Sequence, residues 1–260
     1  MRHSGPATRD DVAQCAAALI ERLRARSPRV HCITNAVAQN FTANVLLAAG
    51  AVPSMTLSVE EIGRFVAGAN ALLVNLGTFD RERREATVIA VETATRQNLP
   101  WVLDPVFIDR SSPRAAFARA LLARAPKAVR LNAAEFTALS SNEPTRDSLT
   151  AYARATNTVI GLSGATDLIG DGERLAAIAN GHALMAKVTA MGCAASALVA
   201  ACLGVEPDAW LATAAALTIA GVAGELAAEK ATGPGSFAVA FVDTLFNVGG
   251  PTLVARAKVS

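Results

Sequence analysis

Ala71-Leu72-Leu73-Val74-Asn75 and Trp101-Val102-Leu103-Asp104, joined by a helical pattern from Arg81 to Gln97, decide the fold. Both runs are short and apolar up to their last residue, which is typical of strands buried on both faces of a parallel sheet. Parallel strands need a crossover of a dozen or more residues, and the helical segment supplies it. The stretch therefore predicts a strand–helix–strand unit of an α/β protein.

The same alternation continues on both sides of this unit. Ser58 and Glu61 have the spacing of a capping box that opens a helix, and Asp171-Gly172 between two apolar runs predicts an antiparallel hairpin. Further strands are predicted at 30–34, 52–55, 128–131 and 159–162, and helices at 12–24, 40–49, from Pro113, and near 193–203, 207–229 and 235–246. We expect a single domain over residues 1–260, with residues 1–10 flexible. Its mostly parallel sheet has helices on both faces and one hairpin near an edge.

The charge balance of the chain argues against a polyanionic partner. The 24 basic and 22 acidic residues are interleaved, the formal net charge is +2, and aromatic residues make up 5% of the chain. With no basic face and few stacking side chains, we expect no nucleic acid partner. The uncharged stretches 36–59 and 188–205 are interrupted or diluted by polar and small residues, so we expect no membrane span.

The cysteines indicate a reducing compartment. They are far apart and include no CxxC spacing, which argues against a zinc site and against a disulfide framework. The N-terminus runs into charged residues without an apolar segment of the kind found in secretory signals. We therefore expect a cytoplasmic protein.

Polar residues follow the apolar runs at the point where each predicted strand ends. They are Thr34 and Asn35, Asn75 and Gly77, Asp104 and Pro105, Asn132 and Glu135, and Ser163 and Gly164. Ligands of parallel sheets bind beyond the carboxyl ends of the strands. We expect these residues to open onto one edge of the sheet.

The loop from Val188 to Cys193 is a candidate anion site. The sequence contains neither a GxxxxGK[ST] P-loop nor a GxGxxG after a strand. A turn with Gly192 at the start of an Ala-rich helix aims unpaired backbone N–H groups and the positive end of the helix dipole at one point. There the dipole is expected to lower the pKa of the Cys193 thiol. The alternative is a buried helix after an ordinary glycine turn, with Cys193 as a small core residue.

Two carboxylates and one arginine complete the candidate site. Asp104 and Glu135 follow strands expected to be neighbours, and such a pair can hold Mg²⁺ directly or through water. Arg130 ends an otherwise apolar strand and can pair with phosphate through its planar guanidinium group. The alternatives are that Asp104 merely ends a strand, that Glu135 sits in the first turn of a helix, and that Arg130 forms a salt bridge.

Several motifs, taken in order from residue 12 to residue 247, resemble the hydroxyethylthiazole kinase family, which has a ribokinase-like fold. They are Val30-His31-Cys32-Ile33-Thr34-Asn35, Asn40-Phe41-Thr42-Ala43-Asn44, Gly50-Ala51-Val52-Pro53-Ser54-Met55, Asn75-Leu76-Gly77-Thr78, Leu103-Asp104-Pro105-Val106, Arg130-Leu131-Asn132-Ala133-Ala134-Glu135, Asn180-Gly181-His182, Lys187-Val188-Thr189-Ala190-Met191-Gly192-Cys193 and Gly233-Pro234-Gly235-Ser236-Phe237.

The resemblance implies a ribokinase-like three-layer sandwich that transfers phosphate from ATP, with Mg²⁺, to the primary alcohol of 4-methyl-5-(2-hydroxyethyl)thiazole. It also implies a homotrimer with its sites between subunits. Its site residues carry over by motif. The thiazole would contact Met55, Ala190 and Asn35, the ATP phosphates Arg130 and Ser163, the metal Asp104 and Glu135, and the reacting alcohol Cys193 and the backbone of Gly192.

Three departures from the family pattern keep alternatives open. Ala190 stands where the family often has Gly, Ser163 where it often has Thr, and residues 106–110, including Phe107, replace a Gly-rich stretch. A bulky Phe107 is expected to reshape the acceptor pocket, and with Ile108 it would block the pocket in a relative that only binds ligands. The alternatives are a ribokinase-like kinase of another small alcohol, an ADP-dependent dehydratase of hydrated NAD(P)H, and a binding protein without activity.

Overall fold

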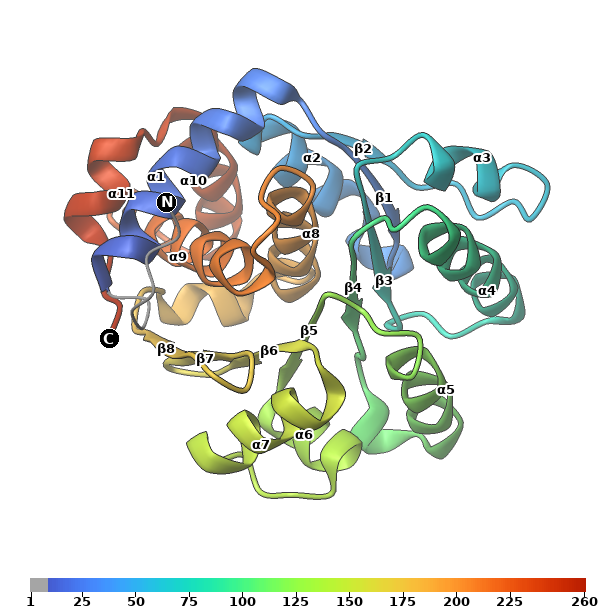
Figure 1. The fold of residues 1–260 in the computed structure, drawn as a ribbon. Helices are drawn as coiled ribbons and strands as arrows, with labels where there is room; N and C mark the ends of the chain where they lie inside the picture. Colours follow the sequence, from blue (N-terminus) through green and yellow to red (C-terminus); the bar gives the residue numbers. More distant parts are fainter. Residues whose placement is uncertain (1–8) are drawn as a thin grey trace.

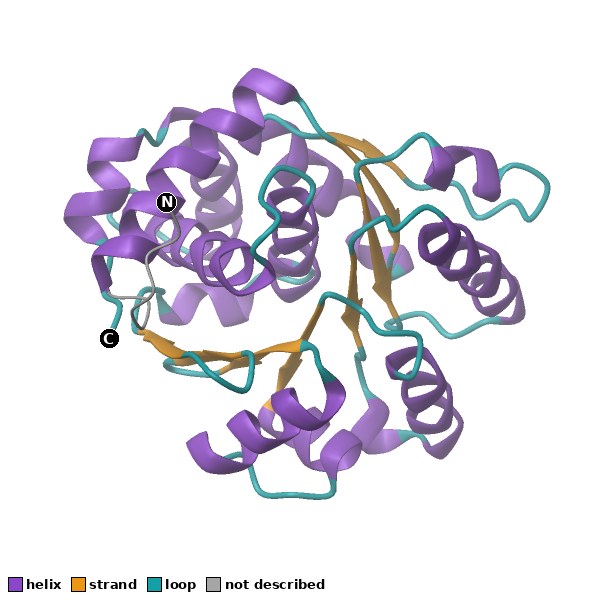
Figure 2. Ribbon diagram, viewed as in Figure 1, coloured by secondary structure: helices purple, strands orange, loops and turns teal. Residues whose placement is uncertain are grey.

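The computed structural model describes residues 9–260, which form a central sheet between two layers of helices (Figures 1 and 2). The sheet has eight strands in the order β2-β1-β3-β4-β5-β6-β7-β8. Strands β1 to β6 pair in parallel, and the β7–β8 hairpin is antiparallel at one edge. The strands are β1 Arg29–Ile33, β2 Val52–Ser54, β3 Ala71–Asn75, β4 Trp101–Asp104, β5 Ala128–Asn132, β6 Val159–Ser163, β7 Asp167–Gly170 and β8 Leu175–Ile178.

The helices divide between the two faces of this sheet. One layer comprises α1 Arg9–Arg26, α2 Gln39–Ala49, α8 Met191–Leu203, α9 Ala209–Ala228, α10 Pro234–Asn247 and α11 Gly250–Arg256. The other comprises α3 Ile62–Ala67, α4 Arg81–Arg96, α5 Ser112–Leu122, α6 Ala133–Ser140 and α7 Arg146–Thr156. Short 3-10 helices η1 Ala36–Ala38, η2 Ile108–Arg110 and η3 Ala183–Lys187 lie in the connections.

Each central strand supplies both cores because successive side chains point to opposite faces. In β3, Leu73 packs in the core with α8, while Leu72 and Val74 pack in the second core with α4. Every residue of β3 and β4 is buried. This explains why the deciding stretch is apolar without alternation, and it confirms the predicted α/β sandwich.

Helix α9 is long and apolar enough by composition to cross a membrane. In the fold, however, 78% of its apolar window is buried, because it packs between the sheet and helices α1, α8 and α10. Its composition therefore reflects a position in the core.

Three expectations about the elements need correction. The capping box at Ser58 does not form, because the Glu61 carboxylate accepts from the Thr56 hydroxyl and α3 begins only at Ile62. Helices α7 and α11 were not expected from the pattern. The expected flexible segment 1–10 lies outside the described residues up to position 8, and Arg9 and Asp10 belong to α1.

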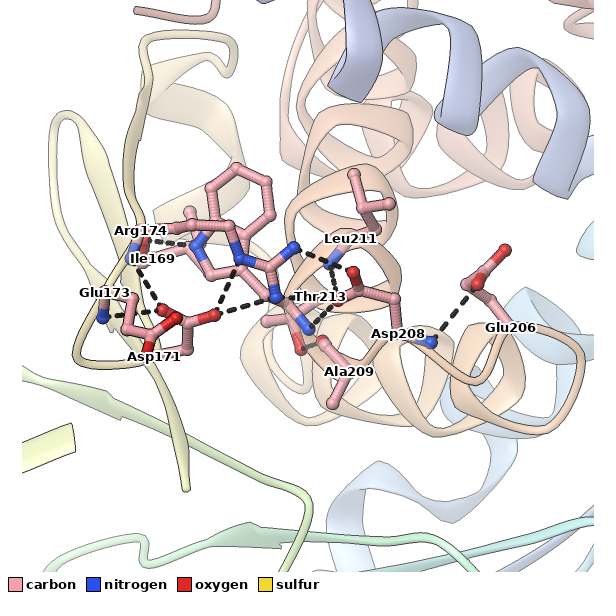
Figure 3. Close-up of polar contacts among 10 residues, drawn as sticks. Ile169, Asp171, Glu173, Arg174, Glu206, Asp208, Ala209, Leu211 and Thr213 are labelled. Atoms are coloured by element: carbon pink, nitrogen blue, oxygen red, sulfur yellow. Dashed lines mark hydrogen bonds and ion pairs between the residues drawn. The ribbon is translucent and has the colours of Figure 1, made fainter. Parts of the chain in front are cut away.

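The hairpin β7–β8 is fastened to α9 by a polar cluster (Figure 3). Arg174 donates from Nη1 and Nη2 to the two carboxylate oxygens of Asp208, at 2.7 and 2.9 Å, and from Nε to Asp171 at 2.7 Å. Asp208 is also the N-cap of α9, since its Oδ1 accepts from the Trp210 and Leu211 N–H groups. The indole N–H of Trp210 donates to Ile169 in β7. These contacts fasten the turn of the hairpin to the start of α9.

Candidate active site

The carboxyl ends of five parallel strands, β1, β3, β4, β5 and β6, lie along one edge, as expected. The register places Asn75 opposite Asp104 and Asn132 opposite Ser163. Parallel pairing brings these polar residues together, although they lie tens of positions apart in the sequence.

Asp104 lies buried at the centre of this edge. Its Oδ2 accepts from the Asn75 side-chain amide at 2.7 Å and from the Ser196 hydroxyl of α8 at 2.8 Å. Burial raises the pKa of Asp104 to about 6; the Arg130 charge opposes the shift and the Glu135 charge adds to it. The carboxylate is therefore fixed by both the sheet and the helix.

Cys193 lies beside this carboxylate in the first turn of α8. Its Sγ accepts from the Asn75 amide at 3.3 Å. The expectation of a lowered thiol pKa is wrong, because burial and the neighbouring Asp104 charge raise the pKa of Cys193 to about 12. The effect of the helix dipole is limited to about 1 kcal/mol at a helix end, and desolvation outweighs it. The group is a neutral thiol at neutral pH.

Glu135 joins two loops at the strand ends. It forms a capping box with Asn132 at the start of α6: Asn132 Oδ1 accepts from the Glu135 N–H, and Glu135 Oε2 accepts from the Asn132 N–H. Its Oε1 accepts from the Phe107 N–H at 3.0 Å. Its position in the first helical turn is confirmed, and its carboxylate also holds the loop after β4.

The turn before α8 differs in detail from the expected glycine turn. The residue in the left-handed conformation is Ala190, with φ of +75°, and Gly192 already belongs to the helix. The Gly192 carbonyl accepts from Arg130 Nη1 at 3.2 Å and from the Ser196 hydroxyl at 3.2 Å. A Cβ on residue 192 would lie 3.4 Å from Arg130 Nη1, which is ordinary van der Waals contact, so the guanidinium group packs closely against the helix start.

A cavity of about 650 Å³ opens next to this helix start. Arg130, Ser163 and Gly192 line it, and the opposite wall is formed by residues 180–183 and by Leu217, Ala220 and Gly221 of α9. A Cβ on Gly221 would lie 2.6 Å from the Cβ of Asn180, so this glycine allows the wall to pack against α9. The volume falls within the range of small-molecule sites.

None of the three residues expected at the thiazole, Asn35, Met55 and Ala190, lines this cavity. Asp104, Glu135 and Cys193 also lie outside its lining. Asn35 Oδ1 accepts from the Val37 N–H and from the Thr78 hydroxyl, which joins the loops after β1 and β3. Met55 follows β2 and is half-buried against the core under α8 and α9. The buried His31 contacts both neighbours of Met55, the Ser54 hydroxyl at 2.8 Å and the Thr56 carbonyl at 3.2 Å.

Some residues of the site were not singled out from the sequence. Asn75 was expected at this edge but without a role, and Ser196 was not singled out at all, although both contact Asp104. Asp167 lines the cavity and its Oδ1 accepts from the Gly164 N–H at 2.9 Å. The sequence did offer one signal for Asp167, since it is a polar residue at the start of an otherwise apolar strand. For Ser196 there was none, because an isolated serine in an Ala-rich helix is common.

Phe107 does not occupy the cavity. It adopts a left-handed conformation with φ of +62°, its side chain is exposed, and the Arg110 guanidinium group lies 5.5 Å from the ring centroid. Phe107 is not among the residues that line the cavity.

The sheet and its two helix layers have the ribokinase-like fold. A ribokinase-like superfamily protein from Enterococcus faecalis V583 shares the fold at a TM-score of 0.68 and 14% identity, over 88% of this chain and 90% of that one.

The particular family follows from closer matches. The profile of the hydroxyethylthiazole kinase family matches residues 20–249. The chain is 43% identical over 244 residues to a probable hydroxyethylthiazole kinase of Agrobacterium fabrum, covering 94% of each sequence. The structure of a hydroxyethylthiazole kinase protein from Pyrococcus horikoshii OT3 matches with a TM-score of 0.91 and 36% identity, over 94% of this chain and 98% of that one. The chain belongs to the hydroxyethylthiazole kinase family, and is thus a phosphotransferase.

Proposed function

We propose that this enzyme transfers the γ-phosphoryl group of MgATP to the primary alcohol of 4-methyl-5-(2-hydroxyethyl)thiazole, as a step of thiamine biosynthesis or salvage. One observation carries the proposal. The Asn75 amide joins Asp104 to Cys193 in the first turn of α8, and Gly192 of the same turn lines a cavity together with Arg130 and Ser163. Phosphoryl transfer needs a place for the polyphosphate, donors for its charge and a positioned alcohol.

The nucleotide is assigned to the 650 Å³ cavity. Arg130 reaches it with a guanidinium group that donates to the Gly192 carbonyl, while its buried Nε has no partner among residues 9–260. A buried unpaired donor is costly, and a phosphate oxygen would satisfy it. The Ser163 hydroxyl donates to the Leu131 carbonyl at 3.1 Å, so it must rotate to donate to a phosphate.

The carboxylates fit a cation that keeps most of its water. Within residues 9–260, no hydrogen bond reaches Asp104 Oδ1, and no group of three or more His, Cys, Asp or Glu gathers as a metal site. Both Glu135 oxygens accept backbone N–H groups, which favours contact through water. Mg²⁺ is commonly held by one or two carboxylates together with phosphates. When bound, it would neutralise charge on the transferred group.

The chain's own residues then have separate roles. The N–H groups at the start of α8, around Gly192 and next to Ala190, would stabilise charge on the moving phosphoryl group. Cys193 would contact the acceptor alcohol as a neutral thiol, because a pKa of about 12 leaves almost no thiolate at neutral pH. Met55 and Asn35 would face the thiazole. Positioning and charge stabilisation supply most of the rate in such transfers, so a strong base is not required.

We further propose a cytoplasmic homotrimer with the acceptor sites between subunits. Helices α2 and α10 pack together, and the ring centroids of Phe41 and Phe241 lie 6.3 Å apart. Both helices also expose large apolar side chains. Those side chains, together with Val37 just before α2, form what we call the α2–α10 face, namely Val37, Leu47, Val239 and Phe246. An apolar face of this kind is typical of subunit contacts.

Phosphorus NMR of the purified protein with ATP, Mg²⁺ and the thiazole alcohol tests the reaction. We expect the signal of a thiazole phosphate monoester to grow as ADP forms, with no monoester when the alcohol is left out. Consumption of ATP with another small alcohol but not with the thiazole would overturn the acceptor assignment. Absence of turnover with every alcohol offered would favour a protein that only binds ligands.

A further inference from the structure

Asn75 uses its entire side-chain amide within the site. Its Oδ1 accepts from the Gly77 N–H at 2.9 Å, which fixes which end of the amide is the oxygen. Its Nδ2 donates to Asp104 Oδ2 at 2.7 Å and to Cys193 Sγ at 3.3 Å. An NH₂ group has two hydrogens, so one serves the carboxylate and the other the sulfur. A single buried amide therefore sets the relative positions of Asp104 and Cys193.

The Ser196 hydroxyl also donates to Asp104 Oδ2, from helix α8. This hydroxyl lies 2.8 Å from Asp104 Oδ2 and 3.2 Å from the Gly192 carbonyl one turn earlier in α8. Asn75 is attached to β3 and Ser196 to α8, and both side chains are almost completely buried. Two donors on Oδ2 leave Oδ1 as the oxygen of Asp104 that is free toward the site among the described residues.

We propose that Asn75 and Ser196 are positioning residues for phosphoryl transfer, which together hold Asp104 and Cys193 in one fixed arrangement with Oδ1 and the thiol facing the reactants. This inference rests on the proposed function. Reacting groups displaced by about 1 Å lose up to roughly 100-fold in rate, so a clamp on both groups has a direct kinetic value.

A purely structural role predicts a different outcome. If the network only tied β3, β4 and α8 together, its loss would lower stability and impair all steps alike. A positioning role instead lowers kcat while nucleotide binding is unchanged, because neither residue lines the cavity assigned to the nucleotide. The variants Asn75→Ala and Ser196→Ala separate these cases. Ser196→Ala removes a single oxygen from a helix and is the milder change.

Matched controls come from the same chain. Asn70→Ala removes a side chain whose Oδ1 accepts from the Arg29 N–H at the opposite edge of the sheet. Thr218→Val removes a buried hydroxyl of α9 that donates to a carbonyl of its own helix. Asn70→Ala deletes an exposed acceptor and Thr218→Val a buried donor, and neither residue contacts Asp104 or Cys193.

Steady-state kinetics of the full-length enzyme give the first readout. We expect kcat to fall about 10- to 100-fold in either variant, with the KM for ATP within about twofold of wild type. The fold-loss of kcat in the double variant should be smaller than the product of the two single fold-losses, because both residues donate to Asp104 Oδ2. The two controls should retain kcat. Folded variants with unchanged kcat, or with kcat and ATP binding weakened in parallel, would overturn the inference.

Alkylation of Cys193 by iodoacetamide, followed by peptide mass spectrometry, gives a second readout that needs no turnover. Loss of the Asn75 donor to Sγ removes a contact that favours the thiolate, so the alkylation rate should fall about two- to tenfold in Asn75→Ala. It should stay near wild type in Ser196→Ala, since Ser196 does not touch the sulfur. If wild type phosphorylates no alcohol but Asn75→Ala still slows alkylation, the proposed function fails while the positioning by Asn75 stands. Equal alkylation rates in wild type and Asn75→Ala would count against that positioning.

Discussion

Ala190 carries backbone strain at the start of α8. Its φ of +75° lies in the left-handed region, where a Cβ costs about 1–2 kcal/mol. We expect Ala190→Gly to stabilise the fold by roughly 1 kcal/mol after the larger chain entropy of unfolded glycine is subtracted, and to raise Tm by about 2 °C. Differential scanning calorimetry measures this. Ala197→Gly, at a helical position of α8, should lower Tm instead. A lower Tm for Ala190→Gly would mean that the methyl group makes a contact that outweighs the strain.

His31 links stability to pH. Burial lowers its pKa to about 4, and the hydrogen bond to Thr56 opposes this shift only in part. In the unfolded chain the His31 pKa is near 6.5. Between about pH 6.5 and 4 the imidazole is therefore protonated in the unfolded chain but neutral in the folded protein. The free energy of unfolding should therefore fall by up to about 3 kcal/mol through this window as pH decreases, and His31 should cost nothing above it.

Urea unfolding of wild type and His31→Gln from pH 7.5 to 4 isolates this effect. Asp104 acts in the opposite direction, because its raised pKa makes the folded state bind a proton first below about pH 6. Asp104 contributes equally to the unfolding free energy of both proteins, so its effect cancels when the two free energies are subtracted. The wild type should lose its advantage over His31→Gln as the pH falls. Parallel curves would contradict a buried neutral imidazole.

At the scale of elements, the hairpin β7–β8 depends on Arg174. Its removal would leave Asp171 and Asp208 facing each other without the cation that joins them (Figure 3). The contact of the guanidinium group with the Trp210 ring, at 4.7 Å from the ring centroid, would also be lost. We expect Arg174→Met to destabilise the fold by about 1–3 kcal/mol. Hydrogen exchange in residues 167–178 should accelerate.

Arg81→Met is the matched control for this variant. Arg81 forms an ion pair with Glu85 in α4, but the two side chains are 85% and 50% exposed. Ion pairs in this setting contribute little, so its midpoint in urea should not move measurably. Equal shifts for the two variants would show that the Arg174 cluster has no special role.

At the scale of the whole molecule, the α2–α10 face is expected to join subunits. Light scattering coupled to size-exclusion chromatography should give three times the chain mass for wild type. Adding charge at two exposed positions, Leu47→Asp together with Phe246→Asp, should give a folded monomer because a buried unpaired carboxylate is costly. Val88→Asp changes an exposed apolar residue of α4, in the opposite helix layer, and should leave the mass unchanged. A wild-type monomer would exclude the trimer.

The sequence by itself determined the layers and the edge where the site lies. Short runs such as Ala71–Asn75 are apolar because both faces of a parallel strand are buried, and this is a local signal. The residue after each run then falls at the carboxyl end of its strand, so Asp104, Asn132 and Ser163 were located by counting. Family motifs supplied the chemistry that counting does not provide.

Only the tertiary structure decided which of these groups touch and how they titrate. Asn75 and Cys193 are 118 positions apart, and Ser196 and Asp104 are 92 apart. No spacing rule relates such residues. The pKa of Cys193 had the opposite direction from the one its helix position predicts, because burial and the Asp104 charge outweigh a dipole that is a local property. Hydrophobic periodicity is a local property of the sequence. The desolvation and the contacts of a side chain depend instead on which distant residues the fold packs around it.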